Sequence, residues 1–303
     1  MKVPSLESPI DNLSQARLDR RNFLRKAGVF GLGAAASGIV LASGSTAMAQ
    51  QESQGEQVQD YSQDRDTIME IATAALIAED LATTFYYNGL TMPVIQSTQL
   101  AGPGGTAMNV TSAGNAGNVM YLRAALSEEI NHANLFRSFL NIPNASKDPI
   151  QTFYFPAGTF MTLQAFTAML DALENAFIAA YINAIQEIAR LASRAKDTHT
   201  YTNDNSPHPS ETLDYYAKVV ATVLGVECEH RVLGRVISNT NPANNWNYEQ
   251  LGTINAVYNG PNSAVAALTP FLTPSTGPAH SFATALANQA SVSVPVMGAA
   301  PLY

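Results

Sequence analysis

Glu129-Ile-Asn-His132 and Glu227-Cys-Glu-His230 are two tetrads of one pattern, and each lies inside an apolar repeat that is typical of a packed helix. Residues three apart on an α-helix differ by about 60° around its axis, so the glutamate and histidine of each tetrad share one face. Leu122 and Phe136 flank Glu129 at seven-residue spacing, the spacing of core positions in packed helices. The sequence therefore predicts that both tetrads point into a helical core.

Two lone glutamates, Glu79 and Glu174, lie in similar apolar patterns earlier in the chain. Each precedes a tetrad at comparable distance, fifty residues in the first case and fifty-three in the second, and each has a tyrosine seven positions later, Tyr86 and Tyr181. The chain thus resembles two copies of one helix pair. Antiparallel packing of the copies is expected to place two equivalent half-sites opposite each other across a pseudo-twofold axis.

Four carboxylates and two imidazoles are in this way directed into one core. A buried carboxylate without partners costs several kcal/mol, so these groups would destabilise the bundle unless something compensates their charge. Two divalent cations would balance the four glutamates. Carboxylate oxygens with imidazole nitrogens favour Fe or Mn over copper or a structural zinc, so we expect two Fe or Mn ions per chain.

The order Glu, Glu-x-x-His, Glu, Glu-x-x-His resembles the ferritin-like di-metal carboxylate superfamily. Three local runs are similar to its exported branch, which includes desiccation-related proteins: Leu126-Ser-Glu-Glu-Ile-Asn-His132, Leu170-Asp-Ala-Leu-Glu-Asn-Ala176 and Val223-Leu-Gly-Val-Glu-Cys-Glu-His230. The resemblance covers roughly residues 62–238. It implies an all-α fold, a ferritin-like four-helix bundle with a long crossover between helices 2 and 3. It further implies the metal ligands, with Glu129 and Glu227 as bridges: Glu79, Glu129, His132, Glu174, Glu227 and His230.

Several residues near these ligands have weaker signals. Tyr86 and Tyr181 are expected either to hydrogen-bond to ligands or to be core residues with a satisfied hydroxyl, with radical transfer as a third role. Asp171, one turn before Glu174, is expected to accept a hydrogen bond from a ligand histidine. By contrast, five residues are interpreted as solvated, packing or loop residues without a role in the site: Glu128, Glu229, the single cysteine Cys228, and the loop histidines His199 and His208.

The amino terminus has the composition of an export signal. Arg20 and Arg21 are followed by Phe23 and Leu24, then by a Gly/Ala-rich stretch, and Ala47 and Ala49 form an Ala-x-Ala processing site. The paired arginines resemble the twin-arginine signal, whereas an ordinary secretory signal is the alternative. We therefore expect residues 1–49 to be removed and the protein to be exported, to the periplasm or the cell exterior, by the twin-arginine machinery.

The rest of the chain divides by composition into a flexible leader at 50–62, the bundle at 63–238 and a C-terminal extension at 239–303 that packs on or near it. Pro/Gly-rich stretches predict a loop at 91–112 and the crossover at 141–158. Within the extension, 264–268 and 281–287 are expected to form short helices. No later apolar run approaches ~20 residues in this interpretation, so no stable membrane span is expected after processing.

Charge narrows the choice of partners. Without residues 1–49 the chain keeps 10 basic and 21 acidic residues, a net charge of −11, which argues against nucleic acid or anionic lipid. The expected function is redox chemistry at the di-metal centre, either oxidation of ferrous ions with O2 or consumption of peroxide. The alternative is a non-enzymatic stress-protection or cell-envelope protein whose site is vestigial or charge-paired. Homo-oligomerisation is compatible with both.

Overall fold

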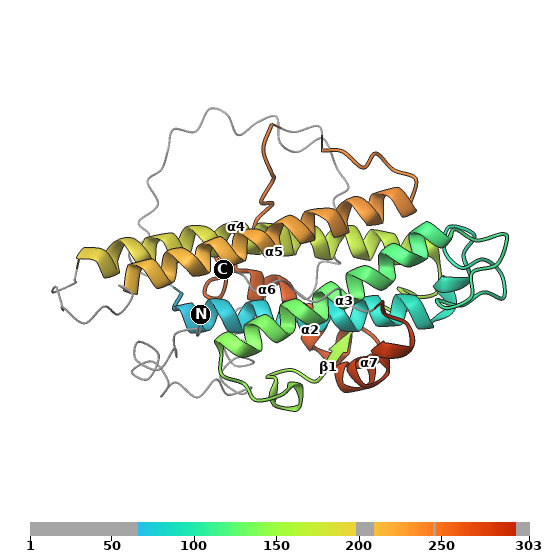
Figure 1. Cartoon of the computed structure of the whole chain (residues 1–303), viewed down its shortest axis with the longest axis horizontal. Coiled ribbons are helices and arrows are strands. Elements are labelled where there is room, and N and C mark those ends of the chain that lie inside the picture. Colours follow the sequence, from blue (N-terminus) through green and yellow to red (C-terminus); the bar gives the residue numbers. More distant parts are fainter. Residues whose placement is uncertain (1–65, 198–208, 245–246, 295–303) are drawn as a thin grey trace, which may run out of the picture.

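Four long helices dominate the computed structural model, which describes residues 66–197, 209–244 and 247–294. They are α2 (Ile68–Thr91), α3 (Ala116–Phe139), α4 (Leu163–Asp197) and α5 (Pro209–Ile237). Figure 1 shows them side by side, and α2 packs mainly on α3 while α4 packs mainly on α5. The two pairs meet where α3 contacts α5 and α2 contacts α4. The all-α class expected from the sequence is confirmed.

Local sequence signals set the ends of these helices. Thr67 caps α2 in a capping box, because its hydroxyl accepts from the Glu70 amide at 3.2 Å and the Glu70 carboxylate accepts from the Thr67 amide at 3.0 Å. The α-helix then stops just before Pro93, whose ring cannot continue it. Asn115 caps α3 by accepting from the Asn118 amide. Each helix therefore begins or ends where side-chain chemistry replaces the missing backbone partners.

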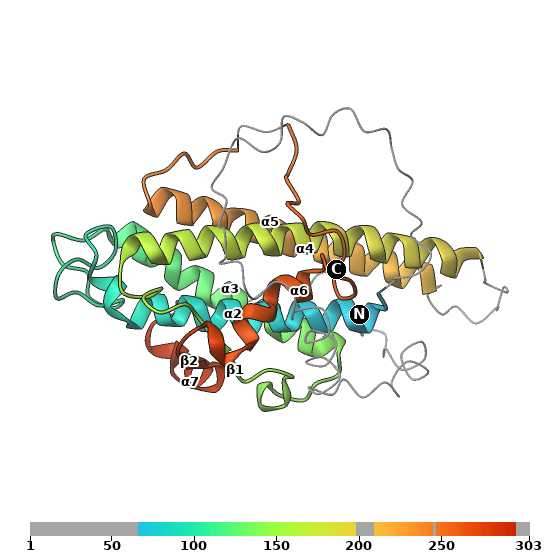
Figure 2. The ribbon, with the colours of Figure 1, turned by 180° about the vertical axis from the view of Figure 1, so that it is seen from behind.

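The chain path returns along the molecule between α3 and α4. In Figures 1 and 2, α2 and α5 run in one direction, and α3 and α4 run in the other. The connecting residues 140–162 include the 3-10 turn η2 (Ala145–Lys147) and the strand β1 (Thr152–Tyr154). This strand pairs antiparallel with β2 (Ala279–Ser281), with Thr152 opposite Ser281. No sequence pattern predicts this pair, because three-residue strands are too short to show an alternating pattern.

The C-terminal part packs on the long helices. Its helices α6 (Ala264–Leu268) and α7 (Phe282–Asn288) both contact α2, and α6 also contacts α4. The remaining 3-10 turns are η1 (Pro93–Gln96), η3 (Thr269–Leu272), η4 (Pro274–Thr276) and η5 (Gln289–Ser291). The two short helices expected at 264–268 and 281–287 are confirmed to within one residue.

Helix α2 is enclosed on all sides. Every residue from Ile71 to Tyr86 is buried, including polar ones. The hydroxyl of Thr73 donates a hydrogen bond to the carbonyl of Met69, and that of Thr84 donates to the carbonyl of Asp80, so both polar groups are paired within the helix. The reason for this burial is that α3 and α4 cover one part of the helix and the C-terminal elements cover the rest.

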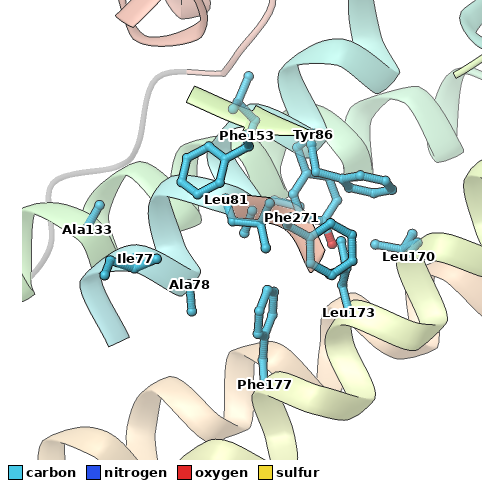
Figure 3. Packing of buried hydrophobic residues seen from close by; sticks show 14 of the residues in the cluster. Ile77, Ala78, Leu81, Tyr86, Ala133, Phe153, Leu170, Leu173, Phe177 and Phe271 are labelled. Carbon is cyan, nitrogen blue, oxygen red and sulfur yellow. The ribbon is translucent and has the colours of Figure 1, made fainter. Parts of the chain in front are cut away.

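The core between the helix pairs is densely apolar around the middle of α2. Figure 3 shows Leu170, Leu173 and Phe177 of α4 directed toward Leu81 and Tyr86 of α2. These side chains are at most 4% exposed. Polar groups placed within this core are therefore shielded from water.

Helix α4 is long and rich in apolar residues. By length and composition alone, the segment Leu163–Ala195 could cross a membrane, with a mean hydropathy of 1.2. The expectation that no apolar segment of this length follows the amino-terminal signal is therefore wrong. In the structure, 56% of its apolar stretch is buried inside the protein. The apolar character of α4 thus serves packing against α5 and α2.

Candidate metal centre

The six ionisable residues singled out in the sequence meet in one place at the middle of the four helices. One group contains Glu79, Glu129, His132 and Glu227, and the other contains Glu129, Glu174, Glu227 and His230. In each group the candidate ligand atoms all lie within 4.8 Å of one another. Both groups share Glu129 and Glu227, which are completely buried. The geometry therefore brings together two overlapping groups of four donors that could hold metal.

The inward atoms of these residues lack ordinary hydrogen-bond partners. Eight buried atoms of these six residues have no hydrogen-bond partner in the described part of the chain: both oxygens of Glu129 and Glu227, Oε2 of Glu79 and Glu174, and Nδ1 of His132 and His230. Buried acceptors without donors cost free energy, and an ionised carboxylate has no proton to share. A pair of cations between them would satisfy all eight atoms at once, so the residues fit a dinuclear metal site.

The histidines make ionic contacts through the same inward nitrogens. His132 Nδ1 lies 3.3 Å from Glu79 Oε2 and 3.3 Å from Glu227 Oε1. His230 Nδ1 lies 2.9 Å from Glu129 Oε1 and 3.4 Å from Glu227 Oε2. These distances bring each imidazole close enough to share one cation with the carboxylates around it.

Without a cation, bound protons reduce the net negative charge of the buried cluster. Burial raises the pKa of Glu79 and of Glu174, and the nearby Glu227 carboxylate raises both further. Burial alone would raise the pKa of Glu129, but the charge of His230 together with polar contacts from His132 and His230 lowers it. Burial opposes the charged form of His132, yet the Glu79 carboxylate raises its pKa well above the usual value. Metal binding to such a site must release protons.

Two tyrosines hold the outer glutamates in a crossed arrangement. Tyr86 of α2 donates a 2.6 Å hydrogen bond to Oε1 of Glu174 on α4, and Tyr181 of α4 donates to Oε1 of Glu79 on α2. Burial raises the pKa of both phenols, and the partner glutamate adds to the effect. Each tyrosine thus keeps its proton and leaves the second oxygen of its glutamate free to face the site.

Two residues behave differently from their sequence interpretation. Asp171 does not contact a ligand histidine, because its carboxylate accepts instead from Arg235 Nε at 3.0 Å and from Asn175 at 2.9 Å. Glu128, expected to be solvated, lies with Oε2 2.9 Å from Nε2 of His230. The sequence around Glu128 could not predict this contact, because its partner His230 belongs to a different helix, α5.

Of the other singled-out residues, the structure describes Cys228 and Glu229. Glu229 is exposed and Cys228 is half-buried, as their sequence positions predicted. The signal residues Arg20, Arg21, Ala47 and Ala49 and the histidines His199 and His208 lie outside the described residues.

No family model, curated protein or solved structure matches this chain. The functional assignment therefore depends on the geometry and chemistry of the site.

Proposed function

We propose that the four long helices form a ferritin-like bundle, with residues 140–162 as its crossover, that holds a dinuclear Fe or Mn centre. Glu129 and Glu227, which belong to both donor groups, would hold both ions. Glu79 and His132 would complete the ligands of one ion, and Glu174 and His230 would complete those of the other. The observation that carries this proposal is the pair of four-donor groups that share two fully buried glutamates.

The donor set supports Fe or Mn. Each position has three carboxylates and one imidazole, and oxygen-rich sites with a single nitrogen suit hard or borderline cations. Four ionised glutamates compensate two divalent ions, so that the buried centre has no net charge. When bound, two adjacent redox-active ions supply electrons to O2 or peroxide.

The chain's own residues define the conditions for that chemistry. The enclosing helices exclude water, Tyr86 and Tyr181 orient the outer glutamates, and the protons on the histidines leave as the ions bind. A ferroxidase or a peroxide-consuming activity fits this arrangement. We place the protein outside the cytoplasm, as the amino-terminal pattern around Arg20 and Arg21 predicts.

One observation favours a second candidate, a metal-free protein with a protective or structural role. The short contacts from His132 to Glu79 and from His230 to Glu129 would be ion pairs if both histidines were protonated. Two imidazolium ions would still leave two of the four buried glutamates to be neutralised by protons. This requirement makes the cation pair the simpler solution.

Elemental analysis of the mature chain separates the two candidates. Purified protein, stripped and then reconstituted with Fe²⁺ or Mn²⁺ under anaerobic conditions, is expected to hold about two ions per chain, as the two donor groups imply. Metal well below one ion per chain after reconstitution would support the charge-paired protein. For the loaded protein, O2 evolution from peroxide with each metal, alongside O2 uptake with excess Fe²⁺, distinguishes the two activities.

A further inference from the structure

The two histidines of the centre are supported unequally. His230 is only 3% exposed, and its outer nitrogen Nε2 lies 2.9 Å from Oε2 of Glu128, whose side chain is 42% exposed. His132 is 12% exposed, and its ion pairs with described residues all involve the inward nitrogen Nδ1. The outer nitrogen of His230 therefore contacts a carboxylate. Among the described residues, the outer nitrogen of His132 has no such ion pair.

The internal repeat shows where the symmetry breaks. Aligning Glu129 and His132 with Glu227 and His230 places Val226 at the position of Glu128. Both residues are half-buried. A valine side chain cannot accept a hydrogen bond, so the second half of the repeat lacks the group that would support His132.

Such a contact changes how an imidazole binds a metal. When the Nε2–H group donates a hydrogen bond to a carboxylate, the ring is fixed in the tautomer whose Nδ1 lone pair is free, and its orientation is fixed as well. The negative charge also makes Nδ1 a stronger base. Nδ1 of His230 is the atom that faces Glu129 and Glu227, so the effect is directed at the metal position.

We propose that Glu128 is a positioning residue that makes the two metal positions unequal, so that the position bounded by Glu174 and His230 binds its ion more tightly and fills first. The inference rests on the proposed dinuclear centre, and it concerns a residue outside the ligand set. Removing a residue that hydrogen-bonds to a metal-binding histidine lowers metal affinity by about 10–100-fold.

Calorimetric titration of the metal-free, mature chain with Mn²⁺ tests the proposal. Two binding steps separated by about tenfold or more are expected. Glu128→Ala should weaken the tighter step by about 10–100-fold and leave the other unchanged. Glu128→Gln keeps an acceptor without the charge, so its effect should be smaller. Glu229→Gln is the matched control, because it removes an exposed charge within the other tetrad and should change neither step.

A reciprocal variant supplies the missing group. Val226→Glu places a carboxylate at the equivalent position in α5 and should tighten the weaker step. Anomalous diffraction from crystals with one Mn²⁺ per chain should show the ion next to His230 in the natural sequence and spread over both positions in Glu128→Ala. Unchanged thermal unfolding of the metal-free variants establishes that the fold is intact.

The results separate this inference from the proposed function. Two equal steps in the natural sequence, or a Glu128→Ala titration that matches the natural one, overturns the role of Glu128 and leaves the dinuclear centre standing. Absence of Mn²⁺ and Fe²⁺ binding in the natural sequence overturns the centre itself.

Discussion

The phenolic hydroxyl of Tyr86 on α2 donates a hydrogen bond to Oε1 of Glu174 on α4, and this 2.6 Å bond crosses from one helix pair to the other. The reciprocal bond runs from Tyr181 to Glu79. Each outer glutamate is therefore fixed by a tyrosine that belongs to the opposite copy of the repeat. The crossed bonds connect the two half-sites directly, which packing within one pair of helices would not do.

Removing either hydroxyl should weaken one metal position only. Tyr86→Phe frees Oε1 of Glu174, so the position that contains His230 should lose about 10–100-fold in Mn²⁺ affinity. Tyr181→Phe should affect the position that contains His132 by the same mechanism. Calorimetric titration measures both variants, and each serves as the control for the other. Identical loss at both positions in each variant would show that the tyrosines do not act separately.

Bridging and non-bridging glutamates should differ in stoichiometry. Glu129 belongs to both donor groups, so Glu129→Gln is expected to lose both ions, whereas Glu79→Gln should retain about one. Elemental analysis after reconstitution gives the count. Melting temperatures provide the control, because metal at 100 times its Kd stabilises the native state by about 2.7 kcal/mol, a gain that Glu129→Gln should not show.

Arg137 is the principal ionic connection outside the centre. Its guanidinium donates to Asp80 of α2 at 2.8 Å and to Asp148 of the α3–α4 connection at 2.6 Å, and it lies over the ring of Phe282 in α7. Arg137→Ala leaves two buried carboxylates without their cation, so a loss of about 3–5 kcal/mol in the free energy of unfolding is expected. Denaturant titration measures this loss.

Arg235 provides a matched comparison for that variant. Its pair with Asp171 is 19% and 40% exposed, so solvent screens the interaction. Arg235→Ala should therefore cost about 1 kcal/mol or less. Equal losses for the two arginine variants would contradict the importance assigned to burial at Arg137.

Glu187 should make stability depend on pH. Burial and the neighbouring Asp66 raise the pKa of Glu187 to about 8, and its Oε1 accepts from the amide of Val257 in the C-terminal part. Since the folded state keeps a proton that the unfolded chain releases near its usual value of 4.5, stability should fall as pH rises from about 4.5 to about 8. Glu187→Gln keeps a side-chain oxygen that can accept from the Val257 amide but removes the titrating group. Denaturant titrations of the metal-free variant should therefore show a weaker dependence of the free energy of unfolding on pH. Parallel curves for both proteins would reject the assignment.

The six residues of the candidate site are predictable from the sequence. Spacing within a helix is fixed at 3.6 residues per turn, so Glu129 and His132 must share a face, and apolar neighbours at seven-residue intervals identify that face as inward. The two short C-terminal helices were also predictable from the breaks around them. In each case the determining interactions are local.

Other features had no local signal. Asp171 pairs with Arg235, sixty-four residues away, and Glu128 meets His230 from a different helix. The contact between β1 and β2 joins Thr152 to Ser281, and its strands are too short for a pattern. Helix α2 carries polar residues all around, yet it is buried because the C-terminal elements cover it.

The amino-acid order by itself determined which side of each helix carries ionisable groups, because that depends only on the helical repeat. The folded chain alone decided which groups from different helices become partners, since this depends on how the helices rotate and pack against one another. Glu128 illustrates the difference: its distance from Glu129 is fixed by the backbone, whereas its contact with His230 exists only because α3 and α5 meet at that level.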